Sequence, residues 1–148
     1  MPRPRIPPAE PSTPDEIEAQ FYEALRRGDI ERLMAIWSDD DDISCVHPGG
    51  PRLGGAAAIR ASFEAMFERG AIQAHPEKVR RLQSHSCAVH SVLERVEVPV
   101  AAGRESAWVV ATNVYLKGAH GWRLVAHHAS PGAPGATQDI VESAAVLH

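Results

Sequence analysis

Residues 105–117, ESAWVVATNVYLK, and residues 121–130, GWRLVAHHAS, are two largely apolar segments separated by the short glycine-bounded turn Gly118–Gly121. Valine, threonine, tyrosine and tryptophan pack well on a pleated surface, so this composition predicts two strands joined as a hairpin. The extended pattern begins further back in the chain and predicts two earlier strands, at about 76–85 and 87–99. The second half of the chain is therefore predicted to be a run of antiparallel strands.

The first half of the chain shows helical spacing. Thr13 can cap a helix whose first residue is Pro14, and Glu16 stands three residues after the cap, as in a capping box. Later glycines and the aspartate after Gly28 predict the ends and starts of two further helices. We expect three helices within residues 13–70, with a short strand at 43–47 between the second and the third.

Helices that precede a run of hairpin-connected strands are typical of an α+β fold. The length of 148 residues fits one domain, which we expect at residues 13–131. Five prolines in residues 1–12 predict a disordered arm, because proline removes a backbone donor and disfavours helix. Residues 132–148 begin with glycine and proline and predict a loose tail.

The composition excludes several classes of function. A net charge of −4 with scattered Lys and Arg gives no reason to expect nucleic acid or anionic lipid as a partner. No apolar run of about 18 residues and no secretory signal is present, so no membrane partner is expected. Cys45 and Cys87 lie far apart without Cys-x-x-Cys spacing, which favours buried free thiols in a reducing compartment. Together these features predict a cytoplasmic protein.

The segment Trp108–Ala111, WVVA, is apolar on both faces of its predicted strand. One face of the sheet can cover the helices, whereas the other needs a second cover to exclude water. A second copy of the chain can supply that cover, because most soluble oligomers are symmetric. We expect a homodimer through the outer face of the sheet that includes Trp108 or Val110.

The order of these motifs resembles ketosteroid isomerase and its SnoaL-like relatives, within the nuclear transport factor 2-like superfamily. The motifs are the Gly28-Asp29 junction, a helix ending near Trp37, the acidic run Asp39–Asp42, His47-Pro48-Gly49, GAAAIR at 55–60, ATNVY at 111–115 and GWRLVAHHAS at 121–130. The resemblance implies a cone-shaped fold, in which a strongly bent mixed sheet wraps around three N-terminal helices and leaves a pocket at the open end. It also implies that the first and last strands lie close together.

The resemblance implies roles for particular residues. The isomerases have an Asp-Pro pair at the end of the first strand, where the aspartate is the general base, and this chain has His47-Pro48 there. A histidine can replace it, because an ordinary pKa of about 6.5 allows either protonation state near neutrality. Phe21 stands where the family has an oxyanion-binding tyrosine, and Tyr22 should point about 100° away. No aspartate lies within 105–117 to complete that site, so ketosteroid isomerase activity is not expected.

Two adjacent histidines near the end of the last strand must point to opposite faces. Regular alternation places His128 on the same face as Trp122 and Leu124, which we expect to be the interior, and His127 on the outer face. His47 and His128 are therefore the candidate catalytic pair. His47 would act as base or acid, and His128 would orient the substrate or shuttle protons.

Four further side chains are candidates for ligand binding: Phe21, Trp37, Phe63 and Asn113. For Trp37 and Phe63 a role as walls of the core is favoured over a specific ligand contact, and Asn113 can equally hydrogen-bond a loop. His47 itself can be a satisfied core histidine. These alternatives cannot be separated without the geometry of the interior.

The sequence predicts no metal and no cofactor. His47 and His128 alone are too few ligands for a transition metal. The run Asp39–Asp42 suits a solvated loop better than a cation site, although clustered carboxylates can hold a hard cation. No glycine-rich nucleotide-binding motif and no phosphate loop is present.

These observations predict a small-molecule-binding pocket protein of the SnoaL-like type. Its unknown ligand would combine apolar and polar parts. A catalytic version of this function is proton transfer of the isomerase, dehydratase or cyclase class, with a histidine as the base. The alternative is a non-catalytic dimerisation or interaction module, in which the outer face of the sheet drives assembly.

Overall fold

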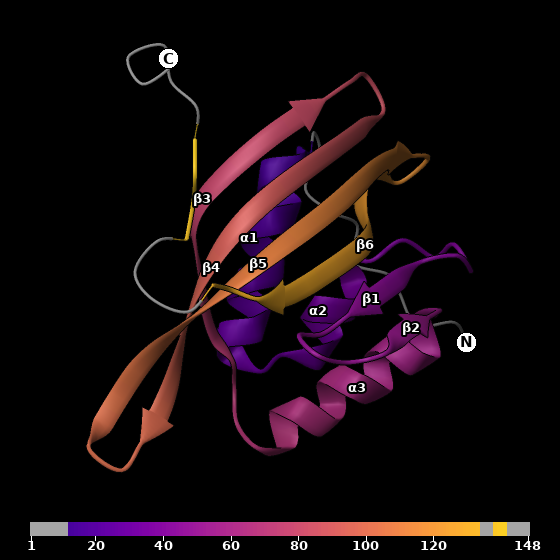
Figure 1. Ribbon diagram of the computed structural model, residues 1–148. Helices are drawn as coiled ribbons and strands as arrows, with labels where there is room; N and C mark the ends of the chain where they lie inside the picture. Colours follow the sequence, from indigo (N-terminus) through magenta and orange to yellow (C-terminus); the bar gives the residue numbers. More distant parts are fainter. Residues whose placement is uncertain (1–11, 134–137, 142–148) are drawn as a thin grey trace, which may run out of the picture.

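A six-stranded mixed sheet bends around the helices in the computed structural model, which describes residues 12–133 and 138–141 (Figure 1). The helices are α1 (Pro14–Arg27), α2 (Ile30–Ala35) and α3 (Ala56–Glu68). The strands are β1 (Ser44–Val46), β2 (Arg52–Gly54), β3 (Gln73–Gln83), β4 (Cys87–Val100), β5 (Gly103–Gly118) and β6 (Gly121–Pro131). The predicted α+β class is confirmed. Most of the predicted arm and tail lies outside the described residues.

The predicted ends of the first helix are present. The hydroxyl of Thr13 accepts a hydrogen bond from the backbone N–H of Glu16 at 3.1 Å, which satisfies one of the free donors at the start of α1. Gly28 ends the helix with a φ of 65°, a left-handed conformation that glycine adopts without strain. Asp29 then caps α2 through a 3.1 Å bond from the N–H of Arg32.

The strands follow the order β2-β1-β6-β5-β4-β3. The long strands β3 to β6 form antiparallel pairs, whereas β1 pairs in parallel with β6. The sheet is therefore mixed, and its first and last strands are neighbours, as expected. β2 is a short strand that the sequence pattern did not predict. This order places the end of β1, and with it His47, beside the second half of β6.

Helix α1 lies across the inner face of the sheet, with α2 and α3 near β1 and β2 (Figure 1). Its apolar side packs into the main core, together with α3 and the inner side chains of β5 and β6. The most deeply buried large side chains include Tyr22, Tyr115, Phe21, Phe63, Ile17, Leu33, Ile59 and Leu124. The interior of the cone next to α1 is therefore filled largely by side chains of the chain itself.

Strand β6 contains a β-bulge at Val125. Tyr115 of β5 pairs with Leu124 and Val114 pairs with Ala126, so Val125 has no partner in the ladder. A bulge of this kind adds one residue to a strand and reverses the inward and outward alternation beyond it. The side chain of Leu124 is buried before the bulge, and that of His127 is buried after it.

The hairpin of β4 and β5 projects beyond the rest of the sheet (Figure 1). Residues 98–100 pair only with residues 103–105, because the pairing of β4 with β3 stops at Glu97 and that of β5 with β6 stops at Val109. The tip is therefore a two-stranded ribbon, with no third strand beside it among the described residues. Val100 near its end is 37% exposed.

The segment that follows β6 makes further contacts with the sheet. The N–H of Gly132 donates to the carbonyl of Trp108 at 2.7 Å, so the segment after β6 runs beside β5. Further on, Asp139 lies 3.4 Å from Lys78 and 3.5 Å from Arg80, on β3. Trp108 and Val110, expected in a dimer interface, are half-buried in the single chain. The homodimer remains a prediction.

None of the helices in the described part of the chain has the length and apolar composition that crossing a bilayer requires. The two cysteines in that part are free thiols; Cys45 is buried, as predicted, whereas Cys87 is only partly buried.

Candidate functional site

The strand register places five side chains in one transverse row across the sheet, which we call the central row. From β3 to β1 its members are Arg81, His90, Asn113, His127 and Cys45, each paired with the next. Except for Arg81, which extends to an exposed aspartate of α1, all are buried. Because register partners share one face, the row brings polar groups from separate strands together beneath α1.

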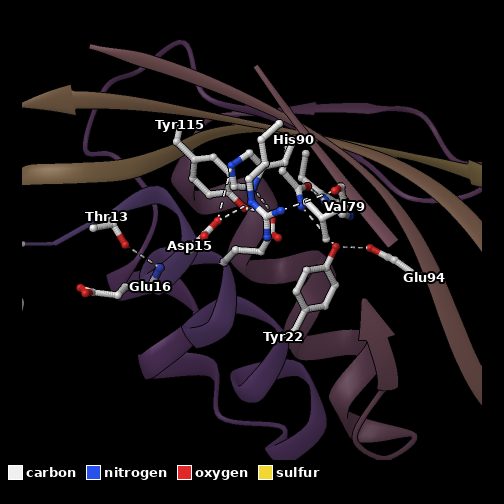
Figure 2. A network of polar contacts seen from close by, with 12 residues as sticks. Thr13, Asp15, Glu16, Tyr22, Val79, His90, Glu94 and Tyr115 are labelled. Carbon is white, nitrogen blue, oxygen red and sulfur yellow. Dashed lines mark hydrogen bonds and ion pairs between the residues drawn. The ribbon is translucent and has the colours of Figure 1, made fainter. Parts of the chain in front are cut away.

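One half of the central row surrounds Glu18 of α1. Oε2 of Glu18 accepts hydrogen bonds from Nδ1 of His90 at 2.7 Å and from the hydroxyl of Tyr115 at 2.8 Å. Nε2 of His90 has no hydrogen-bond partner among the described residues, and lies 3.9 Å from a carboxylate oxygen of Asp15. Asp15 in turn pairs with Arg81 at 2.7 Å (Figure 2).

In the other half of the row, His127 and Asn113 begin a chain of hydrogen bonds that continues outside the row to Tyr22 and Glu94. Nδ1 of His127 donates to Oδ1 of Asn113 at 2.5 Å, because an amide oxygen can only accept. Nδ2 of Asn113 donates to the hydroxyl oxygen of Tyr22 at 3.2 Å. The hydroxyl of Tyr22 donates to Oε2 of Glu94 at 2.6 Å (Figure 2). All four side chains are buried.

Burial controls the protonation of this chain. It raises the pKa of Glu94 to about 7; the hydrogen bond from Tyr22 opposes the shift, and the nearby carboxylate of Glu18 adds to it. Burial, followed by the charge of Glu94, raises the pKa of Tyr22 well above its usual value. Burial also lowers the pKa of His127 to about 3, and His47 and His128 lower it further by repulsion. His127 is therefore neutral at physiological pH.

The hydrogen bond to Asn113 decides which ring nitrogen of His127 is free. With Nδ1 carrying the hydrogen of a neutral imidazole, Nε2 carries the lone pair. Nε2 receives no hydrogen bond from the described residues, yet it is not among their fully buried unpartnered atoms. His127 is only 6% exposed, so Nε2 is a hydrogen-bond acceptor with narrow access from outside.

His47 offers a second free acceptor. Ser62 gives its hydroxyl hydrogen to the carbonyl of Ile59 at 2.8 Å, so its oxygen accepts from Nε2 of His47 at 3.0 Å. Nε2 then carries the hydrogen of the neutral ring and Nδ1 carries the lone pair. Burial lowers the pKa of His47, so the neutral form is favoured here as well. The thiol of Cys45 lies 4.0 Å from Nε2.

Two phenylalanine rings link the histidines through a series of ring contacts. The ring of Phe63 stands edge-on to that of His47, with centroids 4.8 Å apart, and lies 6.4 Å from the ring of Phe21. Phe21 contacts the ring of His127 at 5.1 Å. The candidate ligand residues Phe21 and Phe63 are thus buried core side chains whose ring contacts connect the two imidazoles. Asn113 is the orienting partner of His127.

The expected orientation of His128 was wrong. Its side chain is exposed on the outer face, and His127 takes the interior position beside Asn113. The bulge at Val125 is the reason, because regular alternation holds only up to Leu124. The interior partner of His47 is therefore His127.

Trp37 lies in the core at 4% exposure, and its indole Nε1 has no hydrogen-bond partner among the described residues. Its backbone bridges to Leu124 of β6. No contact in the described structure joins it to His47 or His127. Trp37 is thus a wall of the core in this structure, which is the second of the two roles considered for it.

Sequence reasoning missed Glu18, Tyr22, His90, Glu94 and Tyr115. Tyr22 was expected to point about 100° away from Phe21 around the helix and was not considered for the site, but α1 lies across a curved sheet, so both side chains are buried. A signal for Glu94 was present: a carboxylate within the apolar alternation of β4 requires a buried partner.

The described residues also line a groove of about 520 Å³ on another part of the molecule. It lies between the loop after α2 and the turn from β5 to β6. Charged side chains in its lining are Asp39, Asp40, Asp42, Lys117 and Arg123. Neither His47 nor His127 lines it. The aspartates are exposed, and no group of three potential metal-ligating side chains occurs among the described residues.

Comparisons with known proteins agree with this fold. The family model described as "SnoaL-like domain" matches residues 15–134. A structure from Thiobacillus denitrificans, provisionally described as a calcium/calmodulin-dependent protein kinase type II association domain, is 32% identical. The match covers 87% of this chain and 98% of that one, with a TM-score of 0.73. No curated protein matches.

Two other solved structures are similar. A protein from Streptomyces avermitilis, provisionally described as a dehydratase of the NTF2-like family, is 30% identical over 79% of this chain and 92% of that one, with a TM-score of 0.70. The S. rosetta CaMKII hub shares the fold at 20% identity, over 82% of this chain and 99% of that one, with a TM-score of 0.65. The family match spans most of the chain, so this protein belongs to the SnoaL-like family of the nuclear transport factor 2-like superfamily.

Proposed function

We propose that this protein binds a small molecule beside His47 and His127, that His47 can accept a proton from it, and that His127 accepts a hydrogen bond from it. The observation that carries the proposal is the pair of free lone pairs, Nδ1 of His47 and Nε2 of His127, on two rings that both favour the neutral state. Neutral imidazoles held in one tautomer by partners are suited to general base catalysis.

The same geometry favours a particular kind of ligand. Both free nitrogens are acceptors, so the polar part of the ligand should be a donor, such as a hydroxyl or an enol. An anionic group is disfavoured, because neither ring readily takes the charge that would attract it. The rings of Phe63 and the half-buried Phe67 supply apolar surface for the rest of the ligand.

Abstraction of a proton next to a carbonyl or a hydroxyl is the step that isomerisation, dehydration and cyclisation share. The neighbour described as a dehydratase supports this class of chemistry for the chain. We assign the base to His47, whereas His127, whose pKa burial lowers to about 3, accepts a hydrogen bond from the ligand. His128 keeps no catalytic assignment, because its ring lies on the outer face.

Three probes separate the chemical classes: phenol, which has a donor; anisole, which lacks it; and benzoate, which is an anion. NMR titration should show phenol shifting the ring signals of His47 and His127, anisole binding about tenfold more weakly, and benzoate weakest of all. His127→Gln and His47→Gln should weaken phenol binding, and His128→Gln is the matched control. Tightest binding by benzoate, or equal effects of all three substitutions, would contradict the proposal. Native mass spectrometry of protein from its own cells can then identify a retained ligand.

A second candidate function is homo-oligomeric assembly without catalysis. Two neighbours are described as an association domain and a hub, and the ribbon at residues 98–105 projects from the domain with Val100 exposed. Sedimentation equilibrium of the full chain and of Val100→Glu tests this. A monomer at micromolar concentration excludes assembly, and a dimer that Val100→Glu leaves intact places the contact elsewhere, with Trp108→Ala as the next variant.

A further inference from the structure

The hydrogen bonds from His127 to Glu94 all run in one direction. His127 donates to Asn113, Asn113 donates to Tyr22, and Tyr22 donates to Glu94. Each intermediate group both accepts and donates, so the direction of one bond fixes the direction of the next. The direction is decided at the end of the chain, because an ionised carboxylate can only accept.

We infer that Glu94, acting through Tyr22 and Asn113, sets which ring nitrogen of His127 is the free acceptor. This inference rests on the proposed function, since His127 faces the ligand there. Glu94 is a positioning residue, because two side chains separate it from the imidazole. The protonation state of a carboxyl group remote from the ligand would then decide which polar group of a ligand the site prefers.

Protonation of Glu94 allows the whole chain to reverse. The carboxylic acid can donate to the oxygen of Tyr22, and the hydroxyl hydrogen of Tyr22 is then free to point at Asn113. The amide of Asn113 turns over, so that its oxygen accepts from Tyr22 and its NH₂ group donates to Nδ1 of His127. Nδ1 releases its proton to water, and Nε2 takes one from water. The imidazole stays neutral, and the net change is one proton gained at Glu94.

The groups around Glu94 make it the member of the chain that titrates near neutrality. Burial raises its pKa to about 7, the carboxylate of Glu18 on α1 adds to the rise, and the bond from Tyr22 opposes it. Its register neighbours, Pro76 on β3 and Val109 on β5, carry no charge. His127, at the other end of the chain, stays neutral over the same range because its pKa is lowered to about 3.

The consequence is a change in what the site recognises. Above the pH at which Glu94 titrates, Nε2 of His127 accepts a hydrogen bond, and the site favours a hydroxyl or enol. Below it Nε2 donates, and the site favours a carbonyl oxygen. The hydrogen-bond acceptor at Nε2 is therefore present only while Glu94 is ionised, although the ring itself never becomes charged.

The tautomer of His127 can be measured directly in the ligand-free protein. Side-chain ¹⁵N–¹H NMR distinguishes a ring nitrogen that carries hydrogen from one that carries a lone pair. As the pH falls from about 9 to about 5, we expect the hydrogen to move from Nδ1 to Nε2. The midpoint of this change should coincide with the midpoint of the titration of the Glu94 carboxyl signal. A tautomer that stays constant while Glu94 titrates would overturn the inference.

Two tyrosine variants provide a matched comparison. Tyr22→Phe removes the link but keeps the ring, so the tautomer should no longer follow Glu94. Tyr115→Phe removes an equally buried hydroxyl that donates to Glu18 and also interacts with Asn113, so a transition that persists there and is lost in Tyr22→Phe isolates the path through Tyr22. Persistence of the transition in Tyr22→Phe would refute the role of the chain. If Tyr22→Phe does not fold, the titration of the unaltered protein still decides the question.

These measurements need no ligand, so they are separate from the test of the proposed function. If no probe binds but the tautomer follows Glu94, the proposed function fails and the coupling stands. If phenol binds with the same pH dependence in the wild type and in Tyr22→Phe, the coupling fails and the binding stands.

Discussion

Asn113 and His127 are register partners on β5 and β6, and a 2.5 Å hydrogen bond joins Oδ1 of the amide to Nδ1 of the ring. The bond holds a buried imidazole in one tautomer and directs its other nitrogen away from the protein's own polar groups. A histidine oriented by an acceptor is the usual arrangement of a general base. In this protein the acceptor is neutral, which has a consequence for the pKa of the ring.

Asn113→Asp should raise the pKa of His127 from about 3 toward neutrality. A carboxylate beside Nδ1 stabilises the imidazolium, whereas the neutral amide does not. NMR titration of the histidine ring signals measures the change. The exposed ring of His128 is an internal control, and a His127 signal that moves no further than that of His128 would show that burial alone governs this ring.

Glu94→Gln should change how stability depends on pH. The raised pKa of Glu94 means that the folded state binds more protons than the unfolded state between about pH 4.5 and about pH 7, so this group makes stability fall as pH rises. The lowered pKa of His127 acts in the opposite direction between about pH 3 and about pH 6.5. Removal of the Glu94 contribution, about 3 kcal/mol at most, should leave a stability that rises with pH.

Urea denaturation at a series of pH values measures this difference, with the exposed Glu16→Gln as the control. Parallel profiles for Glu94→Gln and the wild type would mean that Glu94 has the same proton affinity in both states.

Glu18→Leu should destabilise the fold more than Glu18→Gln. Leucine leaves Nδ1 of His90 and the hydroxyl of Tyr115 buried without an acceptor, at a cost of about 1–3 kcal/mol for each group. Glutamine retains one oxygen that can accept from both. Urea denaturation of the two variants at one pH gives the ranking, and equal losses would indicate that the negative charge, rather than the acceptor, is what matters.

The two cysteines should differ in reactivity. Burial raises the pKa of Cys45 to about 12, which keeps the thiol protonated, and its side chain is fully buried. Cys87, at the start of β4, is only partly buried. A small alkylating reagent should modify Cys87 in the native protein and Cys45 only after unfolding. Rapid modification of Cys45 in the native state, with Cys87→Ser as background, would contradict this expectation.

The parts of the fold that local chemistry controls could be predicted from the sequence. Thr13, Gly28 and Asp29 begin and end helices through contacts within a few residues, and the turn at Gly118–Gly121 closes a hairpin. Three helices followed by four long strands come from such signals. The family resemblance added the expectation that the first and last strands are neighbours in the sheet, which places His47 near β6.

The candidate site depended on signals that are not local. Val125 is a β-branched apolar residue with nothing to distinguish it from an ordinary strand residue, so the bulge could not be predicted. As a result, the inner and outer faces of the sheet were assigned to His127 and His128 the wrong way round. Tyr22 and Glu94 are 72 positions apart in the chain, and only the packing of α1 on the sheet brings them together. Short-range periodicity carries no information about such pairs.

The bulge at Val125 also gives β6 a tolerance of changes in chain length. Loss of one residue from a strand normally turns every side chain beyond it to the other face. Here the ladder with β5 is in register on both sides of Val125, so a chain that lacks this residue can pair Leu124 with Tyr115 and Ala126 with Val114 as before. A single deletion at this place would straighten the strand and leave His127 opposite Asn113.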